Sequence, residues 1–195
     1  MNSEQVKKIN VPYLLSYIFV PAAITALCYL VGYLFFHDGG MGAVICFLVP
    51  PVLSILWWIY GGKLIFRRKR TKLMREFEQS GYRPNHTFDS DGGTVIVDIG
   101  QGKIALLFFW NPFQNYILPA SRIANIRTDD GKSGVGFLTG SSRVSFLFTV
   151  DNIRIRVNTF TSNKRWLMDS DYILTGISKA DMMVEVLKEA KERSV

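Results

Sequence analysis

Cysteine and histidine, the residues that most often act as nucleophiles, general bases and metal ligands, are scarce in this sequence. The 195 residues include two cysteines, Cys28 and Cys46, and two histidines, His37 and His86. Because no cysteine follows Cys46, the rest of the chain has no thiolate nucleophile, disulfide framework or cysteine-based zinc site. A histidine-based triad would depend on His86, whose spacing suggests no partner. We therefore expect no enzymatic activity, no metal and no cofactor.

Carboxylate pairs are present, but they fall at positions where turns are expected. The pairs are Asp89 with Asp91, Asp129 with Asp130, and Asp169 with Asp171. Aspartate is common in turns because its side chain accepts hydrogen bonds from nearby backbone amides. The glycine-rich segments GQGK and DDGKSG likewise lack the spacing of a phosphate-binding loop. Turn formation is therefore favoured over metal binding, acid–base catalysis or phosphate binding at these positions.

Charged residues are missing from two long apolar stretches. The first, Val11 to Phe36, has 26 residues, and the second runs from Gly39 to Gly62. A helix that crosses a bilayer needs about 20 apolar residues, so both stretches predict transmembrane helices, at about residues 11–36 and 40–62. The apolar region of a cleaved signal peptide is shorter, about 7 to 15 residues. The length of the first stretch and the second stretch that follows it favour a two-helix hairpin instead.

Acidic residues are rare in the N-terminal part, and this asymmetry accounts for the whole net charge of +7. The first 75 residues hold 9 of the 23 Lys and Arg residues but only 2 of the 16 Asp and Glu residues, whereas residues 76–195 hold 14 of each. A nucleic-acid-binding domain spreads its basic residues over the folded surface that meets the phosphates. The neutral C-terminal part therefore argues against nucleic acid as a partner.

Most of the N-terminal basic residues form one run, KLIFRRKRTKLMR, after the second apolar stretch. Lys and Arg mark the cytoplasmic side of membrane helices, and the connection between the two stretches has neither. We therefore predict a multi-pass protein of the bacterial inner membrane with both termini in the cytoplasm. Trp57 and Trp58 precede the run, at the expected level of the headgroups. The basic residues expected to meet anionic headgroups are Lys63, Arg67, Arg68, Lys69, Arg70, Lys72 and Arg75.

Proline lies within both apolar stretches, at Pro21, Pro50 and Pro51, and is expected to bend the helices. Bent helices can line a pore, so a small oligomeric pore or a transport accessory protein is an alternative function. Ion and proton paths normally use ionisable residues inside the membrane, however, and neither stretch contains Asp, Glu, Lys or Arg.

Short alternating segments follow and predict antiparallel strands. GTVIVDIG and KIALLFFW, joined by GQGK, predict a hairpin with Val95, Val97 and Ile99 on one face. RVSFLFTV and IRIRVNTF predict a second hairpin, joined by the turn DN. The inward residues of the first of these strands are Val144, Phe146, Phe148 and Val150. Further strands are expected in NYILPA, RIANIRT and GVGFLT, which gives about seven.

The C-terminal residues change to a helical period. In SKADMMVEVLKEAKE, Met183, Leu187 and Ala190 recur on one face, and Ser178 with Asp181 predicts the start of the helix. Such a helix can cover an open face or edge of a curved sheet. The predicted fold class is an α+β membrane protein. It comprises an N-terminal two-helix transmembrane hairpin and a C-terminal antiparallel β-sandwich or barrel of about seven strands, capped by one helix.

The expected domain organisation is a membrane hairpin with its basic segment at 1–75, a linker at 76–87 and a cytoplasmic domain at 88–195. The last of these resembles the bacterial pleckstrin-homology-like domains. The resemblance lies in GTVIVDIGQGKIALLFF, YILPASRIANIRTDD, RVSFLFTVDNIRIRVNTF and the helix from Ser178. It implies a small curved β-sandwich with a C-terminal helix. Eukaryotic relatives bind phosphoinositides through a basic loop between the first two strands, but GQGK offers only Lys103, so this activity is not carried over.

Aromatic and arginine residues supply the candidate partner contacts of the C-terminal domain. The segment FFWNPFQNY has five aromatic residues among nine, which form either core and turn or an exposed rim for a protein or the bilayer interface. IRIRVNTF places two arginines outward on one strand. The candidate contacts are Trp110, Phe113, Tyr116, Arg154, Arg156 and Trp166.

The function expected from these features is that of a membrane-anchored, non-enzymatic binding or adaptor protein. Its partners would be anionic membrane lipids and a protein, and the chain could form homo-oligomers. By analogy with other small anchored modules, the setting would be immunity, or exclusion of conjugation, secretion or phage components.

Overall fold

The computed structural model describes residues 5–35, 40–130, 142–162 and 170–194. Two compact units divide the chain. A helical unit comprises Lys8–Lys69 and Phe109–Phe113, and a β unit comprises Met1–Lys7, Arg70–Phe108 and Gln114–Val195. The chain therefore passes between the units four times, after residues 7, 69, 108 and 113.

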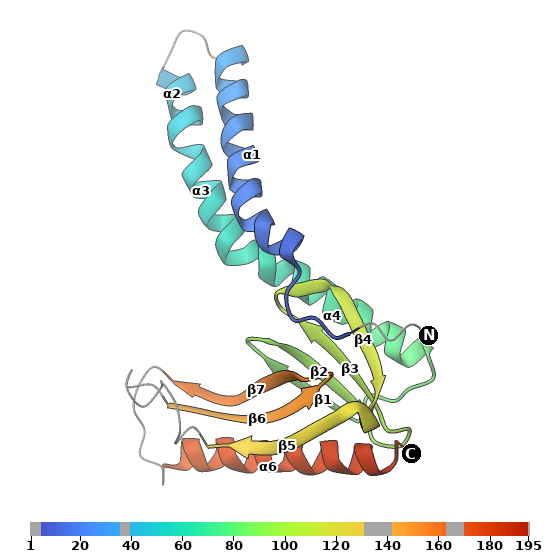
Figure 1. Ribbon diagram of the computed structural model, residues 1–195. Coiled ribbons are helices and arrows are strands. Elements are labelled where there is room, and N and C mark those ends of the chain that lie inside the picture. Colours follow the sequence, from blue (N-terminus) through green and yellow to red (C-terminus); the bar gives the residue numbers. More distant parts are fainter. Residues whose placement is uncertain (1–4, 36–39, 131–141, 163–169, 195) are drawn as a thin grey trace. The chain divides into compact units, whose positions relative to one another are not determined.

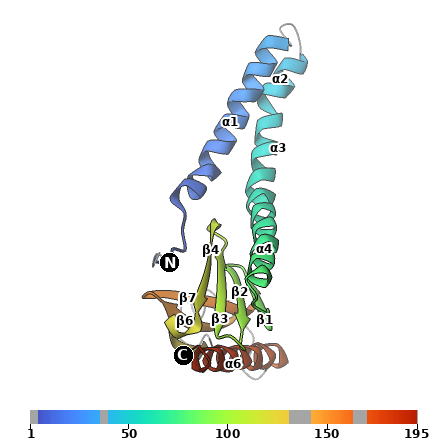
Figure 2. The ribbon, with the colours of Figure 1, turned by 90° about the vertical axis from the view of Figure 1, so that its right-hand side faces the viewer.

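The helical unit contains two arms. The first arm is α1 (Val11–Phe35). The second consists of α2 (Gly40–Phe47), α3 (Val49–Leu56), the π-helical turn η1 (Trp57–Gly61) and the first half of α4 (Gly62–Gln79). Figures 1 and 2 both show α1 running beside α2 and α3.

Two helical stretches are long and apolar enough to cross a membrane, Val11–Leu34 and Val44–Gln79, and the second runs past the second arm to the end of α4. Almost none of the most apolar part of either stretch is buried within the protein. Large side chains such as Ile18 and Leu53 are exposed. The predicted pair of apolar helices is thus confirmed, and their apolar surface is not covered by the described residues.

The prolines affect the two arms differently. Helix α1 continues through Pro21, whose carbonyl accepts a 2.9 Å hydrogen bond from the hydroxyl of Thr25. The second arm is interrupted at Leu48, and Pro50 and Pro51 lie in the first turn of α3. A proline costs little there because the first-turn N–H groups have no partner within the helix.

Helix α4 continues the second arm without a break as far as Gln79. The basic run is therefore helical over its whole length. Irregular backbone is confined to residues 80–85, because the first strand begins at His86. Much of the segment 76–87, expected to be a linker, is regular secondary structure.

The described residues of the β unit form seven antiparallel strands in two sheets. The first sheet has the order β1 (His86–Ser90), β2 (Gly93–Asp98), β3 (Lys103–Phe108) and β4 (Asn111–Pro119). After the 3₁₀ turn η2 (Ala120–Arg122), the second sheet has the order β5 (Ile123–Asp129), β6 (Ser142–Val150) and β7 (Ile153–Ser162). Strand β1 is absent from the sequence prediction, and the strand expected at residues 134–139 lies outside the described residues.

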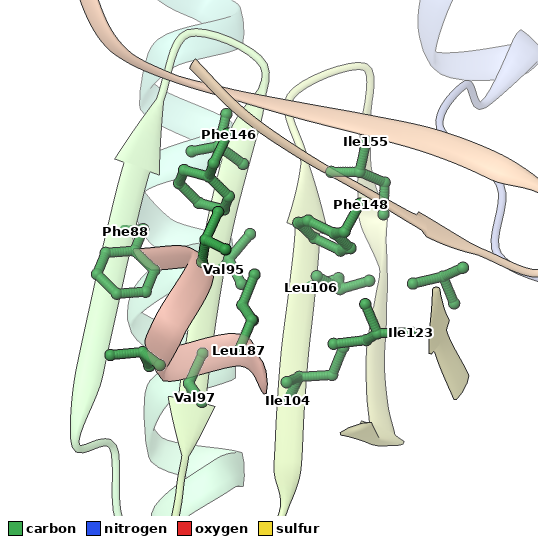
Figure 3. Close-up of a cluster of buried hydrophobic side chains, with 14 of the residues drawn as sticks. Phe88, Val95, Val97, Ile104, Leu106, Ile123, Phe146, Phe148, Ile155 and Leu187 are labelled. Atoms are coloured by element: carbon green, nitrogen blue, oxygen red, sulfur yellow. The ribbon is translucent and has the colours of Figure 1, made fainter. Parts of the chain in front are cut away.

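One apolar core joins the two sheets and the C-terminal helix, as Figure 3 shows. The predicted inward residues of the two hairpins lie in this core, except Ile99, which is partly buried and packs against it, so the predicted inward faces are confirmed. The hairpin β6–β7 turns at Asp151 and Asn152, whose φ values of 50° and 66° are typical of a type I′ turn. The core residues labelled in Figure 3 are Phe88, Val95, Val97, Ile104, Leu106, Ile123, Phe146, Phe148, Ile155 and Leu187.

The C-terminal helix α6 spans Asp171–Glu192 and lies along the second sheet (Figure 1). The prediction that it begins at Ser178 is wrong by two turns. Ile173 is 2% exposed, and a Cβ placed on Gly176 would lie 2.8 Å from the Cβ of Phe160, so the first turns are held by packing against the sheet. Asp181, expected near the start of the helix, instead accepts a 2.5 Å hydrogen bond from the hydroxyl of Thr128.

The second half of α4 covers the outer face of the first sheet. Leu73 and Phe77, one turn apart, are buried, and so are Ile96 and Leu107, which face away from the main core. Figure 3 shows α4 behind the first sheet, on the side opposite the labelled core residues. Polar contacts hold the helix at both edges of the sheet. Arg70 pairs with Asp89 of β1 at 2.6 Å, and Asn115 of β4 donates a hydrogen bond to Glu76.

The segment before α1 also belongs to the β unit. Val6 is fully buried in the main core, and its N–H donates a 3.3 Å hydrogen bond to the carboxylate of Asp151. The same carboxylate pairs with Arg122. The N–H of Lys7 donates a 3.0 Å hydrogen bond to the hydroxyl of Tyr116. Both segments that flank the two arms, residues 5–7 and Arg70–Gln79, are therefore parts of one folded unit.

Candidate interaction surfaces

The outer face of the second sheet carries three arginines around one leucine. On β6, Leu147 lies between Arg127 of β5 and Arg156 of β7 in the strand register. Arg154 lies opposite the next outward residue of β6, Thr149. We call the set Arg127, Leu147, Arg154 and Arg156 the arginine surface. It includes the two arginines predicted from the sequence and adds Arg127.

A hollow of about 330 Å³ lies on this face. Leu147 is only 2% exposed although it lies outside the main core, which is consistent with cover from the aliphatic stems of flanking arginines. The side chains therefore offer guanidinium groups around an apolar floor. The hollow is lined by Asn125, Ile126, Arg127, Leu147, Phe148, Thr149 and Arg154.

A β-bulge in β5 places Arg127 on this face. The β5–β6 register shifts between Ala124 and Arg127, and Asn125 has a φ of 52°. The hydroxyl of Thr149 donates a 3.1 Å hydrogen bond to the carbonyl of Ala124 and lies 3.3 Å from the amide of Asn125, which holds the bulge against β6. A bulge adds one residue and so changes the face of every residue after it. Simple alternation along RIANIRT therefore does not reveal this arginine.

Among the strand residues of this face, arginine outnumbers carboxylate. Arg156 pairs with Asp129 at 2.6 Å, and Arg127 and Arg154 are exposed. A planar guanidinium binds carboxylate or phosphate oxygens through paired N–H donors. The arrangement can hold acidic groups that reach it from solvent.

The predicted basic segment is divided between exposed and packed side chains. Lys69 and Arg70 are partly buried, and Arg70 pairs with Asp89. Lys72 pairs with Glu76 within α4 at 3.4 Å. Five basic residues of the segment are exposed on the helix: Lys63, Arg67, Arg68, Lys72 and Arg75.

An aromatic cluster lies at the end of the helical unit where α1 begins. The turn between β3 and β4 belongs to this cluster. We call Phe109–Phe113 the aromatic turn. The ring of Trp110 lies 5.4 Å from that of Tyr17, and the ring of Phe113 lies 5.6 Å from that of Tyr13. The N–H of Asn10 donates a 2.9 Å hydrogen bond to the carbonyl of Trp110. The turn is thus fixed to the start of α1.

The second arm contributes to the same cluster. Phe66 lies 5.6 Å from Phe109, and the ammonium group of Lys69 lies 5.1 Å from the ring of Phe113. Trp57 packs near Tyr17, with ring centroids 6.3 Å apart. The indole N–H of Trp58 donates a 2.9 Å hydrogen bond to the carbonyl of Tyr17, while its ring is 56% exposed.

Two of the predicted contact residues are not part of these surfaces. Tyr116 is 5% exposed and its hydroxyl is bonded to the N–H of Lys7, so it lies in the core of the β unit. It is buried because it faces inward on β4, next to Phe108. Trp166 lies outside the described residues.

Comparisons with protein families, curated proteins and solved structures give no match. Within the described ranges, no three His, Cys, Asp or Glu side chains gather as metal ligands would. The surfaces are therefore interpreted from their own chemistry.

Proposed function

We propose that this chain is a non-enzymatic binding protein of the bacterial inner membrane. Its two apolar arms form a transmembrane hairpin, and the β unit in the cytoplasm recognises an acidic surface of a protein partner. The arginine surface makes that contact. The basic residues of α4 bind anionic headgroups.

The burial of Val6 is the observation that carries this proposal. Val6 precedes the first arm, yet it lies in the same core as Phe148 and Ile155 from the far end of the chain. A folded core cannot be shared across a bilayer, because every backbone group that crosses must be satisfied within a helix or a closed barrel. The chain between Lys7 and Arg70 must therefore leave and re-enter on one side, as a two-span hairpin does.

The distribution of charge supports the cytoplasmic side for the β unit. Lys7 and Lys8 precede the first arm and the basic segment follows the second. The connection between the arms has no Lys or Arg. Positive charge concentrates on the cytoplasmic side of membrane helices.

The location and topology are tested first. Alkaline carbonate extraction should leave the protein in the membrane pellet. A C-terminal tag should resist protease added to intact spheroplasts and be cleaved after lysis. Release by carbonate, or cleavage in intact spheroplasts, would overturn the hairpin topology.

Partner recognition is tested by mild crosslinking of the tagged full-length protein in its native membranes. The variant Arg127→Glu/Arg154→Glu reverses the charge of the arginine surface. The control Lys179→Glu/Lys188→Glu makes the same change in net charge at exposed positions of α6. We expect a crosslinked protein that is lost from the first variant and kept by the control. Retention by both variants would remove the arginine surface from the proposal.

A further inference from the structure

The aromatic turn leaves much of its apolar surface uncovered. Trp110 is 42% exposed and Phe113 is 55% exposed, although each contacts a tyrosine of α1. Asn111 and Pro112, which lie between them, are buried. The turn therefore separates into residues that fill the interior and two large aromatic side chains that point outward.

The contacts of the turn place it near one end of the first arm. Tyr13 and Tyr17 lie in the first two turns of α1, and Tyr17, whose ring lies 5.4 Å from that of Trp110, is about 9 Å along the helix axis from Val11. With 25 residues, α1 is about 37 Å long, whereas the hydrocarbon core of a bilayer is about 30 Å thick. At a typical tilt of about 20°, several ångströms of α1 therefore lie at the level of the headgroups.

The exposed apolar surface continues from the arms onto the turn. Beside Tyr13, the side chains of Leu14 and Val11 are exposed by 44% and 60%. Tyrosine and tryptophan prefer the boundary between headgroups and acyl chains because each has an apolar ring and a polar group. Lys69, above the ring of Phe113, supplies a cation at the same place, as a phosphate layer favours.

From this continuity we propose that the aromatic turn is a third membrane-contacting element. Trp110 and Phe113 insert into the headgroup boundary of the cytoplasmic leaflet, beside the start of α1. The occupant of this apolar surface is lipid, not a protein partner. This inference rests on the membrane anchoring proposed above and adds a contact that is separate in sequence from both arms.

The test uses full-length protein in vesicles of phosphatidylethanolamine and phosphatidylglycerol. The variant Trp57→Phe/Trp58→Phe/Trp166→Phe keeps Trp110 as its one tryptophan, and Trp57→Phe/Trp110→Phe/Trp166→Phe keeps Trp58. Fluorescence is quenched by lipids that carry a spin label near the headgroup or deep in the acyl chain, and separately by aqueous iodide. We expect the shallow label to quench Trp110 roughly twofold more than the deep label, as for an interfacial side chain.

Trp110 tests the lipid contact of the aromatic turn, and Trp58 tests the membrane anchoring. Quenching of Trp58 by lipid labels, with Trp110 quenched by iodide alone, would overturn the aromatic turn as a lipid contact and leave the anchoring intact. Failure of lipid labels to quench either tryptophan would overturn the anchoring itself. If a triple variant fails to fold by circular dichroism, Phe113→Cys in a Cys28→Ser/Cys46→Ser background is labelled with a polarity-sensitive dye. A water-like emission maximum of that dye would likewise overturn the inference.

Discussion

The two sheets of the β unit differ in what covers their outer faces. Helix α4 lies over the first sheet and buries Leu73 and Phe77 there. The outer face of the second sheet has the arginine surface and its hollow. Strands covered on both sides read as continuous apolar runs, and strands covered on one side alternate. KIALLFFW and IRIRVNTF show these two patterns within one unit.

Under the proposed function, the two sheets have separate roles. Helix α4, which covers the first sheet, begins in the helical unit and continues into the β unit. The second sheet has its inner face in the main core and presents charged side chains outward. Substitutions on the covered face should therefore change stability, and substitutions on the arginine surface should change binding.

The largest loss of stability is expected from Phe77→Ala, which removes a buried aromatic ring between α4 and the first sheet. Loss of a fully buried phenylalanine costs about 3–5 kcal/mol in the free energy of unfolding. Chemical denaturation of the purified protein in detergent, followed by circular dichroism, would measure it. Leu64→Ala, at a 53% exposed position of the same helix, is the control and should change stability little. Equal effects of the two substitutions would show that α4 does not stabilise the sheet.

A smaller loss is expected from Leu147→Ala on the arginine surface. The side chain is buried, but flexible arginine stems can close over the space, so we expect about 2 kcal/mol, the low end for leucine-to-alanine changes. The same denaturation measurement applies. A loss as large as that of Phe77→Ala would mean that this face is packed as tightly as the covered one.

The ion pairs of the two sheets should contribute little and about equally. Asp89→Asn removes the partner of Arg70 and Asp129→Asn removes the partner of Arg156, each pair having at least one substantially exposed side chain. We expect each change to cost about 0.2–1 kcal/mol and to lose part of that cost in high salt. Unfolding midpoints at low and high salt would test this. A salt-independent loss at either position would contradict it.

The smallest change in stability is expected from Arg154→Ala. An exposed arginine contributes within about 0.5 kcal/mol to folding. Binding should nevertheless weaken if this guanidinium meets an acidic partner. Crosslinking yield from native membranes, measured beside the unfolding midpoint, would separate the two effects. A strongly lowered midpoint with unchanged crosslinking would reverse the tasks assigned to the sheets.

The periodic and apolar parts of the fold could be predicted from the sequence. Uncharged stretches predicted both arms, and alternation predicted the hairpins β2–β3 and β6–β7. Strand β1 was missed because HTFDS is short and has one core residue, Phe88. The start of α6 was missed because its first turns are fixed by contact with Phe160, which no local pattern reveals. The burial of Val6 could not be predicted, because a single buried residue forms no periodic pattern in the sequence.

The candidate surfaces were only partly predictable for the same reason. Arg154 and Arg156 follow from alternation, but Arg127 reaches the same face through a bulge at Asn125. The aromatic turn was left open between core and surface, and its residues divide between the two. Which residue takes which role depends on contacts with Tyr13 and Tyr17, almost a hundred positions earlier in the chain.

The hydrogen bond between Val6 and Asp151 joins residues 145 positions apart and so constrains the order of assembly. A ribosome releases Val6 first and Asp151 only after both arms and six of the strands have been made. The core of the β unit therefore cannot close over Val6 until the strands and the helix α6 that share this core have been synthesised. Since translation proceeds at about 5–20 residues per second, several seconds pass between the synthesis of the arms and that closure. Val6 is thus synthesised long before the residues that bury it.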